Sequence, residues 1–381
     1  MKSVPTKTKQ GIGAAILVAA MALPSYHSAF AEAAPENGVV AFKYLNYKDS
    51  QPGQDRISVN AYTTSVMMPF AGKWSVSGSY TYDSLSGASP RRHDYFDTVA
   101  GASIMSEERN AGDLNFTRYL ERGSVTLGAS YSQESDYIAR SYSLLRSFST
   151  IDNNTTITLG GSYNTDTINA WKKEVYGKSK RVYAGLIGVS KVLTKTDIVQ
   201  VNAGFSRGEG YFSDPYKEAE GGTLDPRPKE RNITTFLTRW NHHFNSSDGT
   251  AKVSYRYYTD SYDISAHTFG LEYVQPLPYS LTITPSVRYS SQTAASFYVP
   301  KALYNSLADP ATPYSYDERL SAFGALTLGV KVEKKIAADW TVDVKYEHYE
   351  QRASWCMTGN GDSGLEPFRF RSIQLGISRL L

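Results

Sequence analysis

Cysteine and histidine are scarce in this sequence, which has one cysteine and six histidines among 381 residues. The single Cys356 excludes an internal disulfide framework and any zinc site built from several cysteines. No second cysteine can resolve an oxidised thiol, so we expect Cys356 to be a bystander and not a redox centre. The sequence therefore predicts neither a metal nor a cofactor.

Long apolar runs are also missing. Hydrophobic residues make up 41% of the chain and charged residues 20%, and the mean hydropathy is −0.40. This composition disfavours a bundle of membrane helices, each of which needs about 20 apolar residues. It is compatible with a membrane β-barrel, whose strands alternate apolar and polar residues. The 29 tyrosines suit a surface that is partly wet and partly apolar.

The first residues have the three-part pattern of a secretory signal peptide. Lysines precede an apolar stretch at residues 11–23, and Ala-Phe-Ala at 29–31 forms a small-residue cleavage pattern before Glu32. The apolar stretch is shorter than the ~17–25 residues of a spanning helix. We expect residues 1–31 to be removed and residues 32–381 to form a single domain. Cys356 is far from the cleavage point, which excludes lipid anchoring at the new N-terminus.

The net charge depends on this cleavage. The full chain carries a formal charge of +3. The only charged residues within 1–31 are lysines at positions 2, 7 and 9, so the mature chain is formally neutral. The positive net charge of the full chain therefore comes from the predicted signal peptide, and we expect no nucleic-acid partner.

Short segments with a period of two fill the mature chain. In residues 125–131, one face carries Val, Leu, Ala and Tyr, and the other carries Thr, Gly and Ser. The same alternation occurs at residues 74–82, 199–206, 281–289 and 340–347. Strict alternation over such lengths is typical of half-buried β-strands.

The connections between these segments alternate between short and long. Short polar turns are expected near residues 69–72, 121–123, 152–154, 194–197, 245–249, 276–279 and 337–339. Longer or less tightly defined connections are expected near residues 49–55, 84–110, 134–136, 164–180, 208–230, 259–263, 293–318 and 352–366. These fifteen connections join about sixteen strands, with fourteen or eighteen as alternatives. The predicted fold is all-β: a closed antiparallel transmembrane barrel with short periplasmic turns and long extracellular loops.

Aromatic placement and the C-terminus favour the same fold over a soluble sandwich or propeller. Aromatic residues fall near strand ends, where an interfacial girdle would sit: Trp74, Tyr82, Tyr131, Phe205, Tyr257, Tyr289 and Trp340. The C-terminal Gln374, Gly376 and Leu381 fit the pattern of an outer-membrane assembly signal, whereas Arg379 departs from it. A soluble β-protein gives no reason for the alternation of short and long connections.

Several ordered motifs resemble a proteobacterial family of unknown function. They are Ser-Gly-Ala-Ser-Pro at 86–90, Arg-Tyr-Leu-Glu-Arg-Gly at 118–123, Ser-Asp-Pro-Tyr-Lys at 213–217, Arg-Tyr-Tyr at 256–258 and His-Thr-Phe at 267–269. The resemblance covers nearly the whole mature chain and implies a signal-peptide-bearing outer-membrane barrel. It implies no substrate or catalytic residue. The resemblance also implies neighbouring genes for a flavin transferase and a thioredoxin-like protein, which would hint at envelope redox chemistry.

The faces opposite the apolar stripes supply the candidate site. We expect these residues to line the lumen: Arg256, Asp260, Glu272, Arg288, Lys331, Glu333, Asp343, Lys345 and Glu347. Charges of both signs can set the field of an aqueous pore, or they can form a mutually neutralising wall. The loop acids Asp214, Glu218, Glu220 and Asp225 could meet Ca²⁺ or cations that bridge lipopolysaccharide, but their spacing matches no calcium loop, and they are interpreted as solvated charge.

Histidine gives weak support for an enzyme. His242 and His243 are adjacent, so on a strand they point to opposite faces and cannot chelate one ion. His267 and His348 are expected on outward faces near strand ends. A rim hydrolase would need Ser or Asp beside one of them, and no nucleophile motif is present.

Three hypotheses follow. The first is a passive channel or transport barrel for small polar solutes in the bacterial outer membrane. The second is a structural barrel that docks a periplasmic partner in a redox or flavin-linked system, and the third is a rim hydrolase. Expected partners are outer-membrane lipid, lipopolysaccharide and the barrel-assembly machinery.

Overall fold

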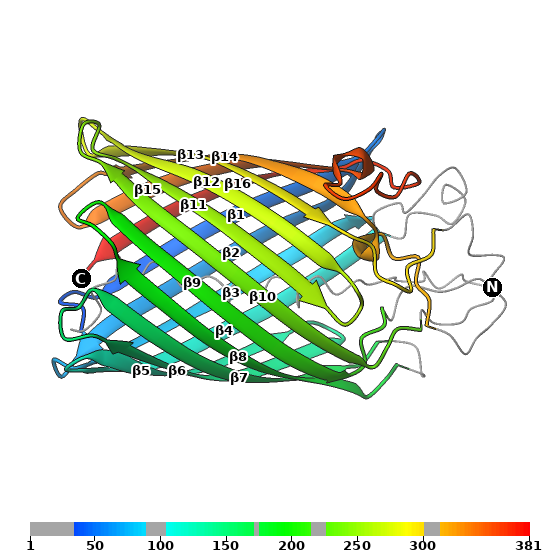
Figure 1. Ribbon diagram of the computed structural model, residues 1–381, viewed down its shortest axis with the longest axis horizontal. Helices are drawn as coiled ribbons and strands as arrows, with labels where there is room; N and C mark the ends of the chain where they lie inside the picture. The colour runs from blue at the N-terminus through cyan, green and yellow to red at the C-terminus, as the bar shows by residue number, and fades with distance from the viewer. Residues whose placement is uncertain (1–33, 89–103, 171–174, 215–225, 301–312) are drawn as a thin grey trace.

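The computed structural model describes residues 34–88, 104–170, 175–214, 226–300 and 313–381. The predicted signal peptide lies outside these residues. Sixteen strands make up nearly all of the described chain (Figure 1). They are β1 (Val39–Gln51), β2 (Gln54–Phe70), β3 (Trp74–Ala88), β4 (Ile104–Leu120), β5 (Gly123–Gln133), β6 (Tyr137–Ser149), β7 (Thr155–Ile168), β8 (Lys178–Val192), β9 (Asp197–Gly210), β10 (Glu230–Phe244), β11 (Gly249–Asp260), β12 (Ser265–Leu277), β13 (Leu281–Gln292), β14 (Phe323–Lys335), β15 (Trp340–Arg352) and β16 (Phe368–Leu380).

The strands close into one antiparallel barrel. Each strand pairs with its neighbours in chain order, and β1 pairs with β16, from Val39 opposite Leu380 to Ser50 opposite Arg369. Closure leaves no strand edge with unpaired backbone groups, which is the requirement for a sheet surrounded by lipid. The predicted fold class and the count of sixteen are confirmed.

The barrel is inverted relative to a soluble protein, with its apolar side chains on the outside. In β5 the exposed Leu127, Ala129 and Tyr131 alternate with small residues that face inward, Thr126, Gly128 and Ser130. In β14 the exposed Leu328, Val330 and Val332 alternate with inward polar positions in the same way. The period-two pattern of the sequence thus separates an apolar outer face from a polar inner face.

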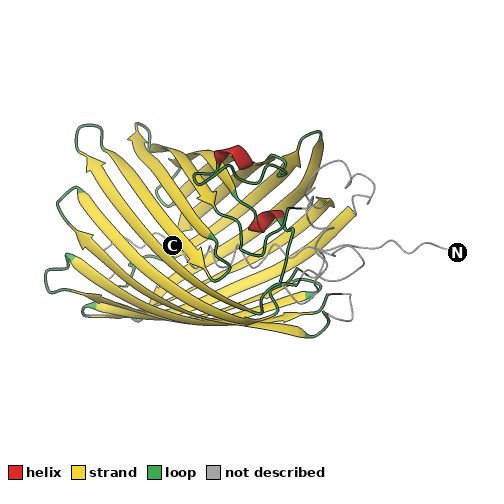
Figure 2. Cartoon of the chain, turned by 45° about the vertical axis from the view of Figure 1, so that its right-hand side comes forward, coloured by secondary structure: helices red, strands yellow, loops and turns green. Residues whose placement is uncertain are grey.

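The long connections lie at one end of the barrel, which also has a few short ones, and the other end has short turns (Figure 2). The seven predicted short turns all join strands at one end, where β1 begins and β16 ends. At the other end the connections include residues 211–229, 293–322 and 353–367. Within the described residues, the helices are single 3-10 turns, and none is long and apolar enough to cross a membrane.

Several predicted long connections are shorter than expected, because the strands continue into them. Residues 49–55 form a hairpin whose turn is only Pro52 and Gly53, and β3 and β4 extend to Ala88 and from Ile104 into the predicted 84–110 loop. The strands have 11 to 17 residues, so most are longer than the ~9–11 residues needed to span a bilayer. The additional residues are mostly small, polar or charged, and composition alone does not distinguish such a strand end from a loop.

Candidate functional site

The nine predicted lumen residues occupy the inner face of five consecutive strands. Each alternates with exposed outer residues: Arg256 with Val253 in β11, and Lys331 with Val330 and Val332 in β14. By this alternation Glu272 in β12 and Arg288 in β13 also point inward, as do Asp343, Lys345 and Glu347 in β15. A role in solute passage stays a prediction for all of them.

Strands β13, β14 and β15 carry a layered set of charges. The Glu347 carboxylate accepts from Lys345 Nζ at 3.0 Å and from Arg288 Nη2 at 3.4 Å. Lys331 Nζ donates to Glu333 at 2.6 Å. Lys331 lies directly opposite Lys345, and Glu333 lies opposite Asp343. The wall therefore has an acidic row nearer the short turns and a basic row above it. Glu347 and Arg288 lie above that basic row.

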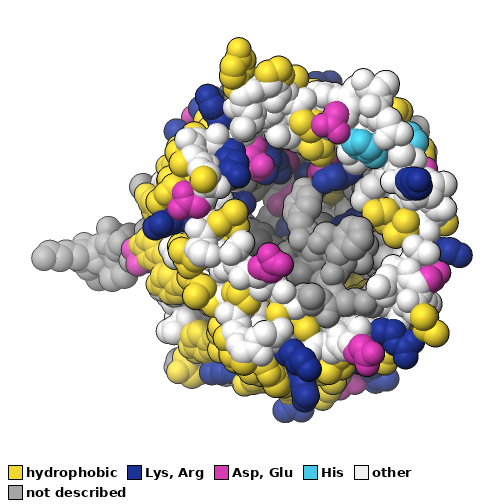
Figure 3. All heavy atoms as spheres, turned by 90° about the vertical axis from the view of Figure 1, so that its left-hand side faces the viewer, with side chains coloured by type: hydrophobic (Ala, Val, Ile, Leu, Met, Phe, Trp, Pro, Cys, Tyr) yellow, Lys and Arg dark blue, Asp and Glu magenta, His cyan; other side chains and the backbone are white. Residues whose placement is uncertain are grey.

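These ion pairs are exposed to different degrees, and exposed pairs contribute little to stability. Arg288 and the Lys331–Glu333 pair are largely accessible, whereas Glu347 is mostly covered. Figure 3 looks onto the short-turn end and shows Lys, Arg, Asp and Glu side chains around the rim of the barrel. Charges that contribute little to folding but point to the inside of the barrel can act on ions and polar solutes near them.

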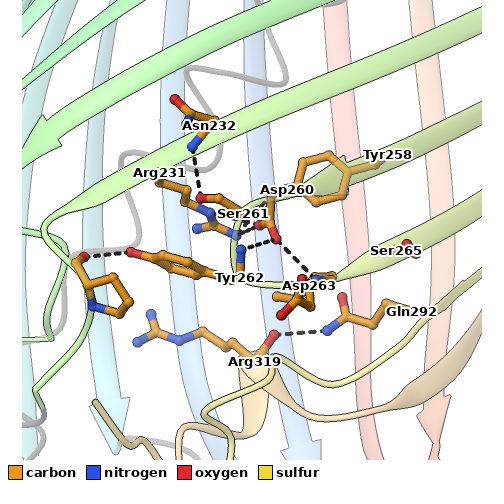
Figure 4. A network of polar contacts seen from close by, with 12 residues as sticks. Arg231, Asn232, Tyr258, Asp260, Ser261, Tyr262, Asp263, Ser265, Gln292 and Arg319 are labelled. Carbon is orange, nitrogen blue, oxygen red and sulfur yellow. Dashed lines mark hydrogen bonds and ion pairs between the residues drawn. The ribbon is translucent and has the colours of Figure 1, made fainter. Parts of the chain in front are cut away.

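Asp260 lies apart from this layered wall, at the loop end of β11. Its carboxylate accepts from Arg231 Nη2 at 2.5 Å and from Tyr258 Oη at 2.6 Å. It also accepts from the backbone N–H groups of Tyr262 and Ile264 at 3.0 and 3.1 Å (Figure 4). So many donors identify Asp260 as an anchor for the 261–264 connection.

A second polar cluster, Asp214, Arg227, Asp317 and Arg319, joins two long connections. We call it the loop clasp. Asp317 is fully buried and accepts from Arg227 Nη2 at 2.6 Å and from Arg319 Nη2 at 2.5 Å. Arg319 also donates to Asp214. A buried carboxylate is stable only when it is paired in this way, so the clasp holds the described parts of two connections together, at Asp214 and Arg227 in one and at Asp317 and Arg319 in the other.

A small apolar core supports the clasp. Tyr262, Ile264, Ala295 and Leu320 are buried together, and the Tyr262 ring packs edge-on against Phe297 at 4.9 Å. The Tyr262 hydroxyl donates to the Pro228 carbonyl at 2.9 Å, which Figure 4 shows beside Arg231 and Asp260. Three connections at the mouth of the barrel are thus packed into one unit.

The interpretation of Asp214 as solvated charge is wrong, because its side chain is buried and paired with Arg319. The clasp arginines and Asp317 were missed, because they lie in segments that the sequence predicts only as long loops. The one available signal was the Ser-Asp-Pro-Tyr-Lys motif, in which Asp214 holds Arg319 and the Ser213 hydroxyl accepts the Arg227 N–H at 3.1 Å.

The histidines form no recognisable catalytic group in the described contacts. His267 Nδ1 lies 2.8 Å from the Tyr255 hydroxyl on the outer face. His242 bonds Asp197 at 2.8 Å, while the adjacent His243 lies 3.2 Å from the Thr250 hydroxyl. Among the described residues, no three His, Cys, Asp or Glu side chains gather as a metal site would require.

Solved structures share the barrel fold at very low sequence identity. A bacterial polysaccharide outer membrane secretin has a TM-score of 0.51 and 7% identity, over 90% of this chain and 98% of the secretin. OccK9 (OpdG) of Pseudomonas aeruginosa has a TM-score of 0.45 and 10% identity, over 91% of this chain and 98% of that one.

The siderophore receptor PirA of Pseudomonas aeruginosa has a TM-score of 0.43 and 10% identity, over 82% of this chain. This chain spans only 56% of the length of that receptor. No curated protein matches the sequence. At such identities, these likenesses concern the fold alone.

The family is shown by sequence. The model of a family described as "Protein of unknown function (DUF3570)" matches residues 13–180 and 169–371. Together these matches cover most of the chain, including every motif on which the resemblance rested. The protein belongs to the DUF3570 family.

Proposed function

We propose that the protein is an outer-membrane barrel that forms a passive channel for small polar solutes. In this placement the short turns face the periplasm and the long connections face outward. The channel proposal rests on one observation above all, the polar, mixed-charge inner face of a sixteen-stranded barrel. Barrels of this size are wide enough for an aqueous channel unless loops fill them.

The outer face supports the membrane placement. Large apolar side chains are exposed around the barrel, and each would cost about 1.5–3 kcal/mol in water relative to burial. At the short-turn end, Trp74 stacks with Phe70 and packs against Phe116 at 4.9 Å. Arg118 lies over the Trp74 ring at 5.1 Å, and Arg379 lies over Trp340 at 5.4 Å. Aromatic and basic side chains paired this way suit a membrane–water interface.

Conductance in planar bilayers tests the channel. We expect stable single-channel currents from the refolded protein, and a shift in ion selectivity in Glu347→Gln. Loss of this carboxylate leaves Arg288 and Lys345 without their shared partner, so the anion-to-cation permeability ratio should rise about twofold or more by local field strength. Glu230→Gln is the matched control, because Glu230 is exposed on the outer face. A correctly folded protein that shows no conductance would contradict the channel proposal.

The loop clasp favours a second candidate, a structural barrel that docks a periplasmic redox or flavin-linked partner. Three connections packed into one unit at the mouth would suit a barrel whose lumen is closed. This candidate expects no conductance from the wild type, and a periplasmic protein captured by crosslinking in cells. A conducting wild type with no crosslinked partner would exclude it.

A further inference from the structure

Basic side chains gather on the outer face where β15, β16 and β1 reach the loop end. We call Lys48, His348, Arg352, Arg369 and Arg371 the outer basic patch. Arg369 and Arg371 share the face of the exposed Ile373, and Lys48 shares the face of the exposed Phe42. Lys48 and Arg371 are exposed to solvent as well. The patch therefore faces away from the lumen, toward whatever surrounds the barrel.

The strand register forces these charges together. Lys48 lies directly opposite Arg371, and Arg371 lies directly opposite His348. Like charges directly opposite each other on a sheet destabilise it. No described carboxylate forms an ion pair with Lys48 or Arg371. An external anion bound between these side chains would relieve their mutual repulsion.

The one carboxylate within the patch is already engaged. Glu350 accepts from Arg352 Nη2 at 2.5 Å and from Arg369 Nη2 at 2.9 Å. These three residues leave one net positive charge. With Lys48 and Arg371, the patch carries three positive charges even when His348 is neutral.

The position of the patch relative to the apolar outer surface indicates which kind of anion it could bind. Directly toward the short turns, the same outer face becomes apolar, with exposed Tyr346, Ile373 and Leu375. Arg371 and Ile373 are two residues apart, a step of about 6.6 Å along a strand. The patch thus lies one step above the apolar belt, at the level of lipid headgroups, where Arg and Lys bind anionic lipid. The guanidinium fork suits phosphate in particular.

The basic character is local. Arg207, also on the outer face at the loop end, is paired with Glu209 at 2.9 Å and lies 3.7 Å from Glu230. At the opposite end, Arg379 is paired with Asp339 at 2.8 Å. Because each of these arginines is paired with a carboxylate, neither position has an excess of positive charge. The outer basic patch differs from both in this respect.

We propose that the outer basic patch binds the phosphates of the lipid A part of lipopolysaccharide. The choice of lipopolysaccharide rests on the proposed function, which puts the loop end in the outer leaflet. Arg371 and Lys48 contact the phosphate, and the Arg352–Glu350–Arg369 group holds Arg369 beside it. The acyl chains lie along the apolar belt below.

Native mass spectrometry of the refolded full chain in detergent tests this site. We would titrate diphosphoryl lipid A, dephosphorylated lipid A and phosphatidylglycerol against the wild type and Lys48→Gln/Arg371→Gln. The double variant should bind diphosphoryl lipid A about 25-fold more weakly, at about fivefold for each cation near an anionic lipid. Arg207→Gln should bind as the wild type does. Heat-modifiable migration on gels verifies that each variant is folded.

Two results would overturn the site. One is equal lipid A affinity in the double variant and the wild type, and the other is equal affinity for phosphatidylglycerol and diphosphoryl lipid A. Binding is measured without conductance, so a protein that binds lipid A but never conducts contradicts only the channel. Fractionation of cells tests the membrane placement separately.

Discussion

Glu134 and Asp317 are buried carboxylates at the loop end whose surroundings differ in charge. Asp317 is neutralised by Arg227 and Arg319. Glu134 lies in the connection between β5 and β6, and burial raises its pKa from 4.5 to about 7. Asp136, Glu107 and Asp83 raise the pKa further, and Arg109 only partly offsets them. Residues remote in sequence contribute in both cases: Arg227 to Asp317, and Arg109, Glu107 and Asp83 to Glu134.

Glu134→Gln should therefore stabilise the barrel in a pH-dependent way. The folded pKa exceeds the unfolded value, so wild-type stability falls as pH rises from about 4.5 to about 7, and the loss is complete above that range. The variant should match the wild type near pH 4 and exceed it at pH 8 by up to about 3 kcal/mol. Urea unfolding followed by tryptophan fluorescence in detergent measures this. The exposed Glu230→Gln is the control, and parallel pH profiles for Glu134→Gln and wild type would contradict the prediction.

At the scale of elements, the β4–β5 hairpin explains the Arg-Tyr-Leu-Glu-Arg-Gly motif. Arg118 lies over Trp74 on the outside, and Tyr119 is buried with its hydroxyl 3.1 Å from Ser75 Oγ. Gly123 has a φ of +124°, and a Cβ there would lie 1.9 Å from the Ser147 carbonyl oxygen. The motif thus joins an interfacial aromatic contact, a buried tyrosine and a turn that excludes side chains.

Gly123→Ala should destabilise the barrel more than Gly53→Ala does. Both glycines have positive φ, but a Cβ at Gly53 meets nothing within 4 Å. Backbone strain alone costs about 1–3 kcal/mol, and at Gly123 the clash with fixed backbone adds to it. Urea midpoints of the two variants measure the difference. Equal midpoints would show that the hairpin relaxes around the new methyl group.

For the whole molecule, the barrel and the loop clasp form two separable layers. The ladder from β1 to β16 closes without the clasp residues, whereas the clasp ties only connections at one end. The strands should therefore keep their pairing when the clasp is broken. The mouth should change, because three connections depend on it.

The substitution Asp317→Asn tests whether the loop clasp and the barrel are independent. Removing one partner of a buried ion pair costs about 3–5 kcal/mol locally, so the connections should loosen while the barrel still migrates as a folded species. In planar bilayers we expect larger or more frequently switching currents than in the wild type. Asp152→Asn, in a short turn at the other end, should leave the currents unchanged. Identical currents in Asp317→Asn and the wild type would show that the clasp does not control the mouth.

The sequence determined the barrel because period-two alternation is a local property, and each strand records its own inner and outer face. It also located the short turns, whose Gly, Asn and Asp residues act locally. The strand ends needed the tertiary structure, because a polar strand above the membrane has the composition of a loop.

The tertiary structure alone brought Arg227, Asp317 and Arg319 into one clasp, and Lys48 beside Arg371 in one patch. Arg227 and Asp317 meet where two connections pack together, whereas Lys48 and Arg371 meet only when the barrel closes. Closure sets the register between the first and last strands, and no local pattern in the sequence encodes that register.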